Sequence, residues 1–129
     1  MIRICTSLSS AGYKVTLVGT KNSSSPPLIP KNFEQRRLTT WFRKGPGFYA
    51  EYNCRLFFFL LLTKANLLCA IDLDTIIPVW LVSVKKKKKR VYDAHEYFSQ
   101  QKEIVTRPHI YRIWHWIERK MVPQFPNGY

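Results

Sequence analysis

The clearest hydrophobic pattern lies at the centre of the chain. Leu67–Ile71 is a continuous apolar run with the length of a strand, and polar residues flank it on both sides. Such continuity is typical of a parallel strand that is covered on both faces. Apolar positions then recur at helical spacing from Ile76 to Val84, and Arg90–Tyr92 begins a second strand. Strand, helix and strand within about 30 residues predict a βαβ unit, whose two strands run parallel.

Weaker patterns flank this unit. The segments expected before it are a helix over residues 4–11 that ends at Gly12, a strand over 13–18 that closes at Gly19, a short strand over 36–40 and a buried helix over about 48–63. After it, Pro108 opens an amphipathic helix, and the apolar stripe of that helix is Ile110, Ile113, Trp114, Ile117 and Met121. The pattern as a whole predicts an α/β, Rossmann-like fold with a mostly parallel sheet and helices on both faces.

Length and composition narrow the class. The chain has 129 residues, of which 46% are hydrophobic, so it is too apolar for a disordered tail and suits one α/β domain. Its longest uncharged apolar run, Leu56–Leu62, is much shorter than the roughly 18 residues of a membrane span. The first residues lack the pattern of a signal peptide, so a cytoplasmic location is expected. Cys5, Cys54 and Cys69 form no C-x-x-C pair, which argues against a disulfide framework or a zinc site and favours core positions.

Charge adds a set of candidate partners. Lys and Arg number 21 against 8 Asp and Glu, a net charge of +13 that favours contact with polyanions. The densest run is Lys85, Lys86, Lys87, Lys88, Lys89 and Arg90. It is either the solvated end of a helix or a contact with the anionic inner face of the plasma membrane. Nucleic acid is not expected, because no base-stacking aromatic motif accompanies the run.

Trp116 is a second candidate for membrane contact. It lies off the apolar stripe of its helix and near Arg112, Arg119 and Lys120, a composition found at membrane interfaces. The alternative is that its indole stacks on arginine or packs against another part of the protein.

Candidate chemistry follows the two central strands. Asp72 and Asp74 come directly after the first, and Asp93, His95 and Glu96 come at the end of the second. Because parallel strands end at the same edge of a sheet, where α/β proteins bind ligands, we expect these side chains to share one rim.

Each of these residues also has a structural interpretation. Asp74 is well placed as a helix N-cap, and Asp72 is equally suited to holding loop amides. His95 suits hydroxyl recognition or proton handling, but it is also suited to a purely structural role. Glu96 could cap the following turn. The sequence contains no histidine pair with zinc-binding spacing, so no metal is expected. It also contains no glycine-rich phosphate loop and no serine nucleophile elbow.

Several segments, in this order, resemble the N-terminal domain of family 4 glycosyltransferases, which are retaining enzymes of the GT-B type. The most specific are residues 70–75 with Pro78, which resemble "D-L-D-T-L-x-P", and residues 91–98, which resemble "V-Y-D-x-H-E-x-F". Residues 114–123 resemble the following "W-x-x-x-E-x-x-x-x-P" helix. Residues 3–8, 12–19 and 51–62 resemble the family's first helix, second strand and next helix.

The resemblance implies transfer of a hexose from a nucleotide-sugar to a glycan or a lipid-linked acceptor, without a further cofactor. His95 would reach toward the transferred sugar, with Asp93 and Glu96 orienting its loop. Asp72 and Asp74 would line the acceptor side of the cleft. In this family the departing diphosphate is usually pictured as taking the acceptor proton, so His95 would act through hydrogen bonding and electrostatics.

The sequence also departs from the family pattern. It begins inside the first helix, and it ends where the next strand would start. The C-terminal domain that holds the nucleotide-sugar, with its E-x7-E motif, is absent from this sequence. Residues 1–129 are therefore expected to form a partial acceptor-side domain that is inactive alone. The alternative is a non-catalytic basic module that docks on anionic membrane or nucleic acid.

Overall fold

The protein is built from helices and parallel strands. The computed structural model describes residues 1–95 and 100–128 and divides into two compact units, Met1–Tyr52 and Asn53–Tyr129. Every strand pair in the described part is parallel, so the predicted α/β fold class is confirmed. None of the described helices has both the length and the apolarity that crossing a bilayer requires.

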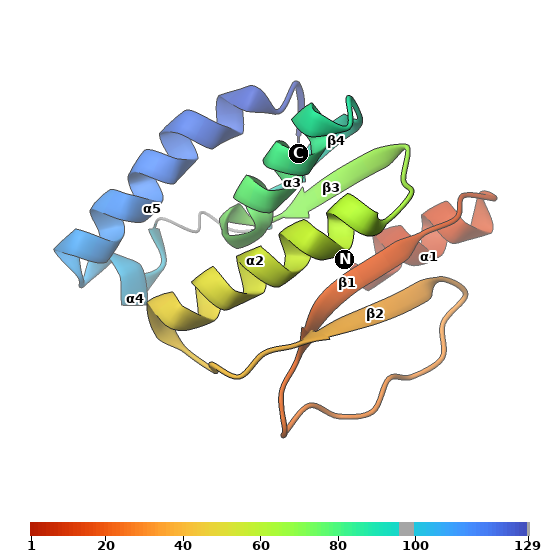
Figure 1. The fold of residues 1–129 in the computed structure, drawn as a ribbon, viewed down its shortest axis with the longest axis horizontal. Helices are drawn as coiled ribbons and strands as arrows, with labels where there is room; N and C mark the ends of the chain where they lie inside the picture. Colours follow the sequence, from red (N-terminus) through yellow and green to blue (C-terminus); the bar gives the residue numbers. More distant parts are fainter. Residues whose placement is uncertain (96–99, 129) are drawn as a thin grey trace. The chain divides into compact units, whose positions relative to one another are not determined.

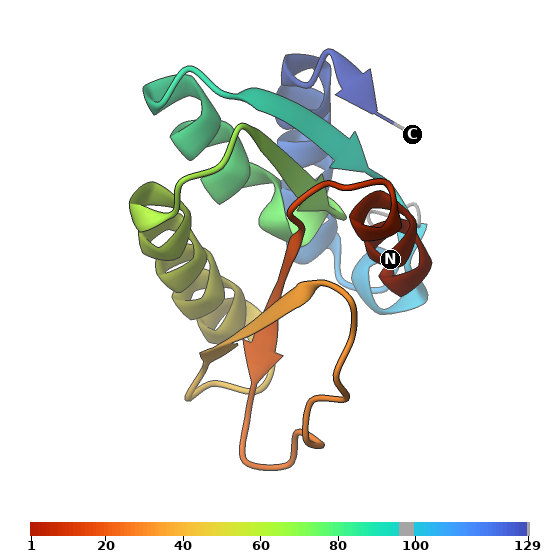
Figure 2. The same cartoon turned by 90° about the vertical axis from the view of Figure 1, so that its right-hand side faces the viewer.

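The first unit contains helix α1 (Ile2–Ser10), strands β1 (Thr16–Lys21) and β2 (Glu34–Thr39), and the start of helix α2 (Gly45–Leu62). Strands β1 and β2 pair in register from Thr16 opposite Glu34 to Lys21 opposite Thr39 (Figure 1). A long loop, orange in Figure 2, joins them. Gly12, with φ of 93°, makes the turn after α1, as the sequence predicts.

Several boundaries in this unit differ from the prediction, and two of these differences have a clear cause. Strand β1 runs from Thr16 to Lys21, and Gly19 lies inside it rather than at its end. Pairing with β2 explains this, because each residue of β1 has a partner as far as Thr39. Helix α2 begins at Gly45 rather than near Phe48. Pro46 is tolerated in its first turn, because the backbone N–H groups there have no partner within the helix and the N–H that proline lacks is not needed.

The second unit is built on a sheet with the strand order β3-β4-β5. The strands are β3 (Leu67–Ile71), β4 (Lys89–Asp93) and β5 (Asn127–Gly128), with β5 beside β4 in Figure 2. The short 3-10 helix η1 (Leu73–Thr75) and helix α3 (Ile76–Lys85) connect β3 to β4 and complete the predicted βαβ unit. The remaining helices are α4 (Lys102–Val105), α5 (Pro108–Met121) and the 3-10 helix η3 (Val122–Gln124).

Four predictions about burial are wrong. Helix α2, which was expected to be buried on most sides, leaves Phe58 60% and Leu62 85% exposed. Strand β3 alternates, with Leu68 and Ala70 buried but Leu67 51% exposed, so apolar continuity did not indicate cover on both faces. In the stripe of α5, Ile117 is buried while Ile113 is 59% exposed, because only part of a helical face meets the core. Cys5 is buried, but Cys54 and Cys69 are exposed.

Candidate functional site

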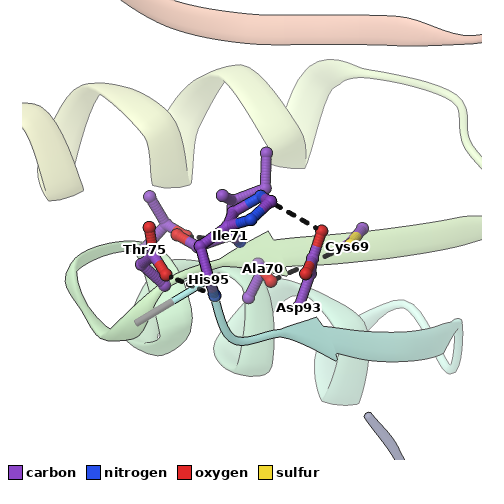
Figure 3. A network of polar contacts seen from close by, with 7 residues as sticks. Cys69, Ala70, Ile71, Thr75, Asp93 and His95 are labelled. Atoms are coloured by element: carbon purple, nitrogen blue, oxygen red, sulfur yellow. Dashed lines mark hydrogen bonds and ion pairs between the residues drawn. The ribbon is translucent and has the colours of Figure 1, made fainter. Parts of the chain in front are cut away.

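The predicted rim exists at the carboxyl ends of β3 and β4. The two strands pair in parallel as far as Ile71 opposite Asp93. Beyond the last pair, the Asp72 N–H donates to the Asp93 carbonyl at 2.9 Å. The His95 N–H in turn donates to Asp72 Oδ1 at 2.9 Å. Asp72, Asp93 and His95 are therefore joined at one edge of the sheet, as Figure 3 shows for Asp93 and His95.

Asp72 has an unusual backbone. Its φ is 57° and its ψ is 173°, a region that L-residues rarely occupy. Such a conformation costs on the order of 1–3 kcal/mol and is often found at functional sites. Here it turns the chain from β3 into η1 while the carboxylate holds the backbone of His95. This agrees with the prediction that Asp72 satisfies a loop amide.

Asp93 and His95 form the chemical centre of this edge. Asp93 is 2% exposed, and its Oδ2 forms no hydrogen bond with any described residue. The imidazole Nε2 of His95 lies 3.5 Å from that oxygen, while the His95 side chain is 39% exposed (Figure 3). A buried carboxylate thus lies beside an imidazole that remains open to solvent. That imidazole can donate a hydrogen bond to a ligand hydroxyl or accept one from it.

Asp74 is not the N-cap of α3, and that structural prediction is wrong. It lies inside η1, and Thr75 takes the N-cap position without a side-chain capping bond. The Thr75 hydroxyl instead donates to the Ile71 carbonyl at 2.7 Å and accepts the Ile71 N–H at 3.0 Å. The backbone carbonyl of Asp74 accepts from Asn53 Nδ2 at 2.9 Å. An extra 3-10 turn before the helix shifts the cap one residue along the chain.

The edge is acidic in spite of the basic chain. Burial, followed by the negative charge of Asp72, raises the pKa of the Asp74 carboxyl to about 6. Burial also raises the pKa of Tyr92 to about 12, and the charges of Asp72, Glu118, Asp74 and Asp93 add to that shift. Several carboxylates therefore create a negative electrostatic potential around Tyr92. Such a field favours hydroxyl groups and cations over phosphates.

The described part of the chain holds no cluster of His, Cys, Asp and Glu residues that could bind a metal ion. Glu96, the remaining residue of the predicted rim, lies outside the described residues.

The basic run is divided between two kinds of position. The Lys86 ammonium donates to the carbonyls of Leu60, Leu61 and Thr63 at 3.4, 3.0 and 2.6 Å, and so caps the end of α2. Arg90 donates to the Gln124 carbonyl at 2.7 Å and lies over the Phe125 ring. Residues 85, 87 and 89 are exposed, and Lys88 is half-buried. Part of the run therefore serves the fold.

Trp116 lies on the outer face of α5 and is 61% exposed. With five neighbours it lines a shallow surface on that helix: Tyr111, Arg112, His115, Arg119 and Lys120. The rings of Tyr111 and His115 stack with centroids 5.4 Å apart. The surface is basic and aromatic, as its sequence suggests.

Three residues outside the predicted candidates are Lys21, Trp41 and Arg43. These residues line a second concave surface, at the carboxyl ends of β1 and β2. A signal was present, because Trp41 directly follows the predicted strand over residues 36–40. The rule that was applied to the central strands would have found it there too.

Comparisons of the chain with protein-family models, with curated proteins and with solved structures gave no match. The resemblance to family 4 glycosyltransferases rests on the sequence motifs described above.

Proposed function

We propose that this chain supplies the acceptor side of a retaining glycosyltransferase, which transfers a hexose from a nucleotide-sugar to a glycan or a lipid-linked acceptor. One observation carries the proposal: the parallel pairing of β3 and β4 brings Asp72, Asp93 and His95 to one carboxyl edge. These residues belong to the two segments with the most specific resemblance to that family.

The electrostatics of the edge support an acceptor role. Carboxylates accept hydrogen bonds from sugar hydroxyls and repel phosphate groups. An edge that carries the carboxyl groups of Asp72, Asp74 and Asp93 is therefore suited to a hydroxyl-bearing ligand. The diphosphate of the donor belongs, by the same resemblance, to a second domain.

In this proposal His95 is the residue that touches the reacting sugar. Its imidazole donates or accepts one hydrogen bond at a sugar hydroxyl, and the buried Asp93 carboxylate, 3.5 Å away, sets the direction of the ring. The contribution of His95 is electrostatic, and it forms no covalent bond to the sugar. Asp72 positions His95 through the backbone amide.

A docking role on the anionic inner face of the plasma membrane is the second candidate. It is favoured by the exposed lysines at 85, 87 and 89 and by Trp116. Co-sedimentation with vesicles that contain phosphatidylserine should weaken steeply as salt is raised. Equal binding to neutral phosphatidylcholine vesicles would contradict this candidate.

NMR of the 129-residue chain tests the acceptor proposal. The chain is titrated with uncharged oligosaccharides and with a short-chain lipid-linked disaccharide, and the His95 ring resonances are followed. We expect saturable shifts at His95 and Asp72 with at least one acceptor. His95→Ala should weaken binding about tenfold, the effect of losing roughly 1.4 kcal/mol. The exposed His109 is the matched control, and His109→Ala should leave binding unchanged.

Two results would overturn the proposal. The first is the absence of saturable shifts at His95 with every acceptor tested. The second is hexose transfer by residues 1–129 alone when a panel of nucleotide-sugars is added, because the resemblance assigns the donor to another domain.

A further inference from the structure

A second concave surface, of about 450 Å³, lies at the carboxyl edge of β1 and β2 in the first unit. Its size falls within the roughly 300–1,000 Å³ range of small-molecule sites. The lining residues are Lys21, Asn22, Ser23, Thr39, Thr40, Trp41 and Arg43. They follow directly from the ends of two parallel strands, which is where α/β proteins bind ligands.

The floor of this surface is held by backbone and side-chain hydrogen bonds. The ladder continues beyond the strands, since the Thr40 N–H donates to the Lys21 carbonyl at 3.0 Å. The Asn22 side chain organises the next turn, where its Oδ1 accepts from the N–H and the hydroxyl of Ser24 at 3.0 and 2.9 Å. These hydrogen bonds fix the position of the Asn22 turn in the absence of a ligand.

Glu51 of α2 fixes the other side. Its carboxylate accepts the N–H of Trp41 at 2.9 Å and the N–H of Phe42 at 3.0 Å. A Cβ added at Gly47 would lie 3.2 Å from the Phe42 ring, so this glycine lets the loop pack closely on the helix. The Glu51 carboxylate thus fixes the backbone of Trp41, while the residue as a whole is 81% exposed.

The exposed side chains of this lining include two cations and one indole. Lys21 and Arg43 line the surface, and Arg43 also donates to the Ser23 hydroxyl. The lining residues include no carboxylate. A guanidinium and an ammonium on one rim are suited to a phosphate or carboxylate group. The face of an exposed indole offers the apolar contact that the C–H face of a sugar ring makes with aromatic residues.

We propose that this surface binds a hexose that bears an anionic substituent. Arg43 and Lys21 hold the phosphate or carboxylate, the Trp41 indole packs on the sugar ring, and the Thr39 hydroxyl faces the ring hydroxyls. The site belongs to the first unit and uses none of the residues assigned to glycosyl transfer. It therefore stands independently of the function proposed above.

Isothermal titration of the full chain with four probes tests this site: glucose 6-phosphate, glucuronate, glucose and inorganic phosphate. Glucose 6-phosphate and glucuronate should bind, and each should bind at least about tenfold more tightly than glucose, because their anionic group adds a charge-assisted hydrogen bond to Arg43 or Lys21. The ratio of the two acidic sugars identifies the preferred anion. Inorganic phosphate should bind more weakly than glucose 6-phosphate, since it lacks a ring to contact Trp41.

Variants separate the two parts of the site. Arg43→Gln should weaken both acidic sugars about tenfold or more. Trp41→Ala should weaken glucose 6-phosphate and leave inorganic phosphate unchanged, while Trp41→Phe should restore part of the loss. The matched controls are Arg119→Gln and Trp116→Ala on the surface of α5, and both should bind as the unaltered chain does. Circular dichroism of each variant verifies that it is folded.

Three results would overturn the proposal. One is the absence of saturable binding by either acidic sugar at millimolar concentration. Another is equal affinity for inorganic phosphate and glucose 6-phosphate, which would indicate an anion site only. The third is binding that survives both Arg43→Gln and Trp41→Ala. His95→Ala should leave all of these affinities unchanged, so failure here is distinct from failure of the acceptor proposal.

Discussion

The two carboxyl edges of the molecule occupy the same topological position and carry opposite charge. The edge of β3 and β4 carries Asp72, Asp74 and Asp93, and the His95 imidazole lies 3.5 Å from the Asp93 carboxylate. The edge of β1 and β2 presents Lys21 and Arg43 beside an exposed indole. Parallel pairing places polar loops at an edge in both cases, but the residues after each strand decide which chemistry that edge favours.

The two edges also differ in how they are held. The acidic edge uses a strained residue, Asp72, and a buried carboxylate, that of Asp93, whose Oδ2 forms no hydrogen bond with any described residue. The basic edge uses the Asn22 turn and the Glu51 carboxylate, each with several hydrogen bonds. Because the acidic edge contains a strained backbone and the basic edge contains satisfied hydrogen bonds, substitutions at the two edges should change stability in different ways.

The largest expected effect is at Asp72. Asp72→Ala removes the charge-assisted bond to the His95 amide and keeps the strained backbone at φ of 57°, so the free energy of unfolding should fall by about 3 kcal/mol through the lost bond. Asp72→Gly loses the same bond but relieves the backbone, and it should cost about 1–2 kcal/mol less than alanine. Urea unfolding measures both. Equal losses for alanine and glycine would show that the edge is not strained.

Lys86 tests whether cations of the second unit serve the fold. Lys86→Ala leaves the last carbonyls of α2 without their donor, at a cost of about 2 kcal/mol in unfolding free energy. The neighbouring exposed Lys85 is the matched control, and Lys85→Ala should change stability by less than about 0.5 kcal/mol. Equal effects of the two variants would show that Lys86 contributes no more to stability than an exposed surface lysine.

Asp74 gives the acidic edge a pH dependence. Its carboxyl ionises near 3.8 when unfolded and at about 6 when folded, so between these values the folded chain holds a proton that the unfolded chain has lost. Stability therefore falls as the pH rises through this window. Asp74→Asn should raise the unfolding free energy at pH 7 by about 1–2 kcal/mol and change it little below pH 4. A gain that is independent of pH would contradict this account.

Glu51 produces the smallest effect and reports on the basic edge. Glu51→Ala frees the amides of Trp41 and Phe42, so their hydrogen exchange should accelerate about tenfold, equivalent to roughly 1.4 kcal/mol. Glu51→Gln retains an acceptor oxygen and should restore most of the protection. If both variants exchange at the rate of the unaltered chain, Glu51 does not position Trp41.

Much of the central unit could be predicted from the sequence. Strand β3 has the predicted bounds, and Asp72 and His95 share an edge, because a short apolar run followed by a helix and a strand restricts the topology. The N-cap at Thr75 could not be predicted, since a 3-10 turn precedes α3 and moves the cap one residue beyond Asp74. The basic edge was missed because pairing with β2 carries β1 past Gly19 to Lys21, and a single sequence does not show such pairing.

One measurement addresses the contrast between the edges directly. Two-dimensional NMR of the isotope-labelled chain is recorded with glucose 6-phosphate and, separately, with an uncharged disaccharide acceptor. We predict that glucose 6-phosphate shifts the resonances of Lys21, Trp41 and Arg43, and that the disaccharide shifts those of Asp72 and His95. Shifts of a single shared set of residues by both ligands would contradict the assignment of different chemistry to the two edges.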